Sequence, residues 1–143
     1  MRSRSFPARR LRVGDLMRPG VAAVDPADNL TDVAKLMRRD RVGAVTVMEA
    51  GRLAGIVTER DLMRTVADGL DPGRTIASER MTPDPYTIAR DELATRAAEV
   101  MIELGVRHLP VVDEDAVVGV ISARDLLRLG RPIPLEELAY EPW

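Results

Sequence analysis

The chain contains the same pattern of residues twice, at a constant spacing of 64 positions. Gly55 to Asp61 reads Gly-Ile-Val-Thr-Glu-Arg-Asp, and Gly119 to Asp125 reads Gly-Val-Ile-Ser-Ala-Arg-Asp. The same spacing pairs Met17 with Met81, Pro19 with Pro83, Met37 with Met101, Val47 with Val111, Leu62 with Leu126 and Arg64 with Arg128. Because the register never slips, the chain is a tandem repeat, and its fold must be built from two copies of one plan.

Each copy of the pattern predicts a strand that runs directly into a helix. Two β-branched residues follow the glycine, which suits a buried strand. A hydroxyl residue then stands where a helix N-cap belongs, with an aspartate three residues further on: Thr58 and Asp61 in the first copy, Ser122 and Asp125 in the second. This is a capping box in its Asp form. One interpretation is therefore that these side chains only cap helices and bind nothing.

The same residues also suit the binding of a nucleotide. A helix N-terminus with free N–H groups and a hydroxyl stabilises a phosphate, and a neighbouring carboxylate can accept hydrogen bonds from a ribose diol. Since the pattern occurs in the same register in both halves, it predicts two related nucleotide clefts.

The doubled pattern Gly-hydrophobic-hydrophobic-Thr/Ser-x-x-Asp resembles that of a stand-alone pair of cystathionine β-synthase (CBS) domains, over roughly residues 13–129. The resemblance implies a mixed α+β fold, in which two βαββα-like repeats are related by a pseudo-twofold axis. It further implies a regulatory module that binds an adenine nucleotide or an adenosyl compound between the two repeats and signals through a partner or a rearrangement of a dimer. AMP, ADP, ATP, NAD and S-adenosylmethionine are the candidate ligands, and no cofactor is required.

Composition and turn residues divide the chain into five segments. We expect a basic, flexible arm at 1–12, the first repeat at 13–68, a linker at 69–75, the second repeat at 76–129 and an acidic tail with the only Trp at 130–143. Within each repeat the hydrophobic pattern predicts a strand, a helix, a hairpin of two strands and a final helix. Each half alone, with three strands and two helices, is marginal for independent stability.

Arg107 and His108 stand directly before Leu-Pro-Val-Val in the second repeat. A basic pair at the edge of a strand is often simply solvated. In CBS pairs that bind adenine nucleotides, however, basic residues at this position often hold the phosphates, so the resemblance implies that these two residues are phosphate ligands. Arg suits this role through its forked donors, and His would add a pH-dependent contribution near neutral pH.

The first repeat departs from this pattern. Gly43 and Ala44 occupy the positions that match the basic pair, and Thr46 stands where the second repeat has Pro110. We therefore expect the two clefts not to be equivalent.

The resemblance also assigns roles to the remaining positions of the motif. It implies that the aspartates bind ribose, that the hydroxyl residues bind ribose or phosphate, and that four apolar residues surround the base. Those apolar residues would be buried in any version of the fold, so they do not discriminate. The complete set of expected nucleotide-binding residues is Val42, Ile56, Thr58, Asp61, Val106, Arg107, His108, Val120, Ser122 and Asp125.

The composition argues against several other functions. The net charge of −2 is not typical of a general nucleic-acid binder. One His and no Cys provide no transition-metal cluster. No catalytic or phosphate-loop motif is present, so we predict no enzyme activity. No apolar run approaches the ~18 residues of a membrane span or forms a signal peptide, so we expect a cytoplasmic protein.

We expect a homodimer and an as yet unidentified protein partner. CBS pairs commonly associate through their helices, and apolar residues at helical positions are available either for such contacts or for the core: Leu62, Met63, Val66, Leu126, Leu127 and Leu129. The alternative function is a ligand-independent dimeric scaffold for protein interaction, in which the Thr/Ser-x-x-Asp boxes only cap helices.

Overall fold

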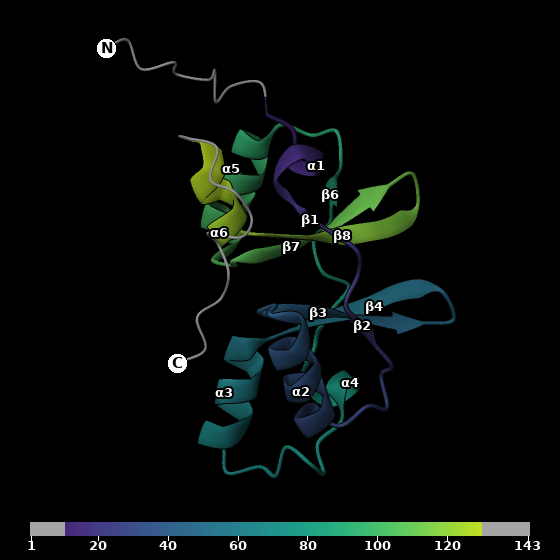
Figure 1. Ribbon diagram of the computed structural model, residues 1–143. Coiled ribbons are helices and arrows are strands. Elements are labelled where there is room, and N and C mark those ends of the chain that lie inside the picture. Colours follow the sequence, from purple (N-terminus) through teal and green to yellow (C-terminus); the bar gives the residue numbers. More distant parts are fainter. Residues whose placement is uncertain (1–10, 130–143) are drawn as a thin grey trace. The chain divides into compact units, whose positions relative to one another are not determined.

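The computed structural model describes residues 11–129 of the 143-residue chain. The predictions for the basic arm up to residue 10 and for the acidic tail from residue 130 lie outside the described residues. The described residues form two compact units, which we call the central unit (residues 21–86) and the terminal unit (residues 11–20 and 87–129) (Figure 1). Each unit has a four-stranded sheet with helices against one face.

The central unit has the strand order β2-β3-β4-β5, in which β2 and β3 are parallel and the other neighbours are antiparallel. Its elements are β2 Ala23–Val24, α2 Leu30–Asp40, β3 Ala44–Glu49, β4 Arg52–Thr58, α3 Glu59–Ala67, α4 Ala77–Arg80 and β5 Thr82–Pro83. The helix α2 begins at Leu30 because the side chain of Asn29 accepts a hydrogen bond from the Asp32 N–H at 3.0 Å. Its apolar stripe packs on the sheet in a core that includes Leu30, Val33, Met37, Val45, Val47 and Val57.

The terminal unit repeats this plan with the strand order β1-β8-β7-β6, in which only β6 and β7 are parallel. Its elements are α1 Val13–Leu16, β1 Arg18–Pro19, β6 Ile88–Ala89, α5 Ala94–Leu104, β7 His108–Asp113, β8 Ala116–Ser122, α6 Ala123–Leu126 and the 3-10 helix η2 Leu127–Leu129. The helices α1, α5 and α6 lie on one side of the sheet (Figure 1), over a core that includes Val13, Leu16, Val100, Leu109, Val111 and Ile121.

The compact units do not coincide with the sequence repeats, because each repeat gives its first segment to the other unit. The elements α1 and β1, from the first repeat, complete the terminal unit, and α4 and β5, from the second repeat, complete the central unit. The repeated glycines permit this. A Cβ at Gly55 would lie 2.8 Å from the Thr82 carbonyl oxygen, and one at Gly119 would lie 2.9 Å from that of Arg18. The glycine of each pattern is therefore required for the close approach of an exchanged strand.

The predicted mixed α+β fold with two repeats of helices and strands is confirmed. Each unit has four strands, one more than predicted for a half, because each sheet also takes up a two-residue strand, β1 or β5, from the other repeat. The last predicted helix is present as α6 followed by η2.

Candidate ligand site

The Ser122–Asp125 motif lies where β8 runs into α6 in the terminal unit. The backbone N–H of Ser122 donates to Oδ2 of Asp125 at 2.8 Å, and the backbone N–H of Asp125 donates to the Ser122 hydroxyl at 3.1 Å. The predicted capping box is therefore formed. The Ser122 hydroxyl thus accepts from the helix backbone, and the Ser122 side chain also interacts with the Asp125 carboxyl group.

The Thr58–Asp61 motif lies at the matching junction of β4 and α3 in the central unit. The Thr58 N–H donates to Oδ2 of Asp61 at 2.8 Å, and the Thr58 hydroxyl donates to the same oxygen at 3.1 Å. This capping box is formed too, but its hydroxyl hydrogen is already used. The two motifs thus share an architecture.

Asp125 is more deeply buried than a helix cap needs to be. Only 5% of the residue is exposed, and this burial raises the pKa of its carboxyl group above the usual value. The hydrogen bonds from Ser122 and the positive charges of Arg18 and Arg128 act on the same pKa in the opposite direction. A buried carboxylate near two arginines is the kind of perturbed group that is frequent at functional sites.

Pairing across the sheet places further predicted residues beside this motif. His108 of β7 lies opposite Ser122, and Pro110 lies opposite Val120. Arg18 of β1 lies opposite Val120 on the other side of β8. Residues directly opposite in antiparallel strands project to the same face. One face of the terminal sheet therefore carries Arg18, Val120 and Pro110 in one row, and Ser122 and His108 in the next.

The basic pair lies at the start of β7. The carbonyl oxygen of Arg107 accepts a hydrogen bond from the Ala123 N–H at 2.8 Å, which places Arg107 beside the first residue of α6. Burial, and after it the charge of Arg107, lowers the pKa of His108 to about 4. The ring is therefore neutral near neutral pH. This low pKa argues against the pH-dependent charge expected of His108 near neutral pH, and its role as a phosphate ligand stays a prediction.

The matching face of the central unit carries no charged side chain in its two rows. Thr82 of β5 lies opposite Ile56, which lies opposite Thr46 on its other side. The next row consists of Thr58 and Ala44. Where the terminal unit has an arginine and a histidine, the central unit thus has a threonine and an alanine.

Thr46 also forms hydrogen bonds to the backbone that Pro110, its counterpart in the terminal unit, cannot form. Its backbone N–H and its hydroxyl both donate to the carbonyl oxygen of Ala22, at 2.9 and 3.2 Å. Pro110, the matching residue of the terminal unit, has neither an N–H nor a hydroxyl to donate. The two sheets therefore differ in hydrogen bonding as well as in charge.

The ten predicted site residues divide between the units: Val42, Ile56, Thr58 and Asp61 are central, and Val106, Arg107, His108, Val120, Ser122 and Asp125 are terminal. Sequence reasoning missed Arg18 and Arg128, whose charges act on Asp125. Arg128 carried a signal, since it matches Arg64 in the repeat. No sequence signal indicated Arg18, because only the exchange of β1 brings it close to the motif.

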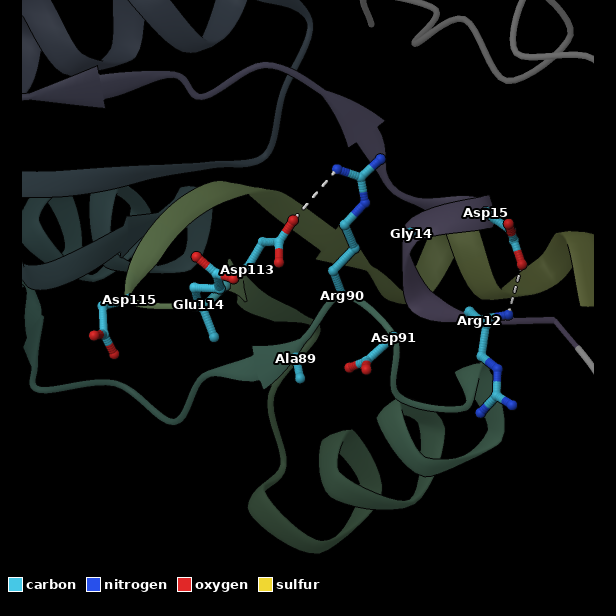
Figure 2. A pocket seen from close by; sticks show the side chains of 10 residues that line it. Arg12, Gly14, Asp15, Ala89, Arg90, Asp91, Asp113, Glu114 and Asp115 are labelled. Carbon is cyan, nitrogen blue, oxygen red and sulfur yellow. Dashed lines mark hydrogen bonds and ion pairs between the residues drawn. The ribbon is translucent and has the colours of Figure 1, made fainter.

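A separate hollow of about 720 Å³ lies in the terminal unit (Figure 2) and contains none of the predicted site residues. Arg90 forms an ion pair with Asp113 at 3.8 Å, and the Arg12 N–H donates to the Asp15 carboxylate at 2.8 Å. The hollow is lined by Arg12, Gly14, Asp15, Ala89, Arg90, Asp91, Val112, Asp113, Glu114 and Asp115. Between residues 11 and 129, no group of three or more His, Cys, Asp or Glu could hold a metal ion.

Known proteins share both the sequence and the fold. The CBS domain family matches residues 13–68 and 76–131. The chain is 36% identical over 115 residues to the CBS domain-containing protein YhcV of Bacillus subtilis, covering 80% of this chain and 81% of that protein. It is 31% identical over 124 residues to the protein MK0525 of Methanopyrus kandleri, covering 85% of this chain but only 63% of that protein's length.

A solved structure adds a likeness of fold. The CBS domain pair of protein MJ0100, in complex with 5′-methylthioadenosine and S-adenosyl-L-methionine, has a TM-score of 0.75 and 24% identity, covering 83% of this chain and 94% of that one. In the part of the chain that the structure describes, no helix is long and apolar enough to cross a membrane. From the two matched domains and the doubled fold, this chain belongs to the CBS-domain family and carries a pair of CBS domains, which is a regulatory module.

Proposed function

We propose that this CBS pair senses an adenine nucleotide or a related adenosyl compound, and that the Ser122–Asp125 motif is its main binding site. AMP, ADP, ATP, NAD and S-adenosylmethionine are the candidate ligands. A sensor must bind its ligand with different affinity in two arrangements, because equal affinity for both transmits nothing. The proposed output is a rearranged homodimer or a protein partner in the cytoplasm.

The observation that carries this proposal is the set of side chains gathered at the start of α6. Ser122 supplies a hydroxyl group and Asp125 a carboxyl group, within one capping box. Arg107 lies beside them, held by its carbonyl bond to the N–H of Ala123. The forked donors of Arg suit a phosphate, the carboxylate suits a ribose diol, and the apolar Val120 suits the face of a base.

The family supplies a second line of support. MJ0100, whose CBS pair shares the fold of this chain, was solved with two adenosyl compounds. At 24% identity the likeness concerns the fold alone, so the ligand of this chain is part of our proposal. Chemical complementarity at the Ser122–Asp125 motif is what connects the two.

Isothermal titration calorimetry with the five candidate ligands tests the proposal. We expect the wild-type chain to bind at least one of them, and Asp125→Ala and Arg107→Ala to weaken that binding by about tenfold or more, since a hydrogen bond to a charged group contributes ~1.5–3 kcal/mol. Asp115→Ala, which removes an exposed carboxylate from the β7–β8 turn, is the matched control and should bind normally. Failure of all five ligands to bind at millimolar concentration would refute the sensor.

One observation favours a second candidate, the ligand-independent dimeric scaffold. Both capping boxes are complete within the protein itself, so helix capping explains the repeated motif without any ligand. The scaffold predicts that Asp125→Ala lowers the free energy of unfolding and changes nothing else. Calorimetry and unfolding measured on the same variant therefore separate the two functions.

Some of the apolar helix residues predicted to lie either in the core or in a dimer contact are packed in a core, and the others are exposed. Leu62, Leu126 and Leu129 pack against the cores of their units. Met63, Val66 and Leu127 are exposed, by 58%, 65% and 68%. If α3 supplies a dimer contact, the double variant Met63→Glu, Val66→Glu should be monomeric by light scattering where the wild type is dimeric.

A further inference from the structure

We propose that Arg18, which the first repeat contributes through the exchanged strand β1, makes the Ser122–Asp125 site selective for phosphorylated adenosine. The ligand class is then an adenine nucleotide such as AMP, and neither adenosine itself nor the cationic S-adenosylmethionine. This inference rests on the function proposed above and adds the residue that decides among its candidate ligands.

The sheet holds Arg18 on the same face as the motif. Arg18 lies directly opposite Val120 in the β1–β8 pair. Ser122, two residues further along β8, projects to the same face, because side chains alternate along a strand. The backbone of β1 approaches β8 so closely that Gly119 cannot carry a side chain without a clash. Arg18 is thus placed by a paired strand, which gives a ligand contact the ordered geometry that it needs.

A second set of contacts fixes the segment that precedes Arg18. The carbonyl oxygen of Leu16 accepts a hydrogen bond from Nη1 of Arg128 at 3.4 Å. At the other end of α1, the N–H of Val13 donates to the carbonyl oxygen of Glu92 at 2.9 Å. The first repeat is therefore tied into the terminal unit on both sides of α1, directly before the strand that carries Arg18.

The charges that act on Asp125 are those of arginines. The positive charges of Arg18 and Arg128 both act on Asp125, and Arg107 lies beside the first residue of α6. Burial disfavours the charged form of Asp125, the carboxyl group on which Arg18 and Arg128 act. In such a field a phosphate gains charge-assisted hydrogen bonds, whereas the sulfonium group of S-adenosylmethionine is repelled.

The central unit provides an internal comparison for this inference. Thr82 occupies in β5 the position that Arg18 occupies in β1, opposite Ile56 and beside the Thr58–Asp61 motif. A threonine is therefore compatible with an exchanged strand in this fold. Arg18→Thr replaces the cation with the residue that the same molecule uses at the matching position, which makes it the most conservative test available.

Calorimetry of AMP and adenosine on the full chain tests the inference. We expect Arg18→Thr to weaken AMP about tenfold, the factor that one lost hydrogen bond to a charged group predicts. The affinity for adenosine, which has no phosphate, should change by less than about twofold. Wild-type protein should also bind AMP more tightly than S-adenosylmethionine, and this preference should shrink in the variant.

Two further variants separate charge from folding. Arg18→Lys keeps the positive charge, and it should retain most of the preference for AMP over adenosine. Arg38→Thr removes an exposed positive charge from α2 in the central unit, and it should leave both affinities unchanged.

Equal losses of AMP and adenosine in Arg18→Thr would mean that Arg18 only holds the sheet together. Unchanged AMP affinity would mean that it does not meet the phosphate, and tighter binding of S-adenosylmethionine than of AMP by the wild type would contradict the selectivity. Each of these results overturns the inference and leaves the sensor standing. If the wild-type chain binds none of the five candidate ligands, the sensor itself fails, and this inference fails with it.

Discussion

The two copies of the motif share their frame and differ in what surrounds it. In both, an aspartate accepts the N–H of the N-cap residue at 2.8 Å, and in both a glycine lets an exchanged strand approach. Around this frame the terminal unit presents Arg18 and His108 where the central unit presents Thr82 and Ala44. The residues that repeat therefore build the fold, and under the proposed function the residues that differ between the repeats are the ones that distinguish ligands.

The shared glycines give the largest expected effect, because they test the feature in which the two units agree. Gly119→Ala places a Cβ 2.9 Å from the Arg18 carbonyl oxygen, and Gly55→Ala places one 2.8 Å from that of Thr82. Neither backbone can move away without displacing β1 or β5. We expect each variant to lower the free energy of unfolding by about 2–3 kcal/mol, measured by urea unfolding followed by circular dichroism.

Gly73→Ala is the control for this pair, since its Cβ would meet only side-chain atoms, the nearest at 3.3 Å. It should change the free energy of unfolding by less than about 0.5 kcal/mol. A loss in Gly73→Ala as large as in the other two would mean that the exchanged strands are not what the glycines accommodate.

The histidine tests a feature that only the terminal unit has. Folding lowers the pKa of His108 from 6.5 to about 4, so between these values the unfolded chain binds a proton that the folded chain does not. Stability therefore rises with pH across this window and is lost on acidification. We expect His108 to account for about 2 kcal/mol of that loss, after a discount for partial solvent exposure.

His108→Ala introduces the residue of the central unit, and it should flatten the pH dependence of the free energy of unfolding between pH 6.5 and 4. The comparison uses slopes, so any constant effect of the smaller side chain cancels. Parallel slopes in the wild type and the variant would mean that the ring is as accessible to protons in the folded chain as in the unfolded one.

The parts of this structure that were predictable from sequence are those set by local patterns. The repeat, the mixed α+β fold and the junctions at Thr58 and Ser122 follow from hydrophobic spacing and cap residues. The exchange of β1 and β5 was not predictable, because the sheet that each strand joins is set by long-range contacts and not by a local pattern. The proximity of Arg18 to the motif depends on that exchange, and the neutral ring of His108 depends on burial in the folded chain, so neither could be predicted.

A buried threonine of the central unit makes hydrogen bonds that have no counterpart in the terminal unit. The Thr65 hydroxyl donates to the carbonyl oxygen of Asp61 at 2.8 Å and accepts from Nε of Arg80 at 3.1 Å. The terminal unit has Leu129 at the matching position, so this anchor of α3 has no counterpart there. Thr65→Val keeps the shape and leaves the Arg80 donor without this acceptor. We expect urea unfolding to show a loss of about 1.5 kcal/mol.

Thr95→Val, on the exposed face of α5, is the matched control and should stay within about 0.5 kcal/mol of the wild type. Equal effects of the two threonine variants would show that the Arg80 contact does not stabilise α3.

The smallest expected effect is the loss of stability when either of the two motif aspartates is replaced. Asp61→Ala removes an ordinary capping box and should lower the free energy of unfolding by about 1 kcal/mol. Asp125→Ala should cost less at pH 7, because burial already disfavours the charged form of that carboxyl group.

A raised pKa means that folding favours the protonated group, so the contribution of Asp125 is greatest in acid and declines as the pH rises through its folded pKa. The cost of Asp125→Ala should therefore grow between pH 7 and pH 3. Equal costs for both variants at pH 7 would mean that burying Asp125 carries no penalty, and the contrast between the motifs would then lie only in the side chains around them.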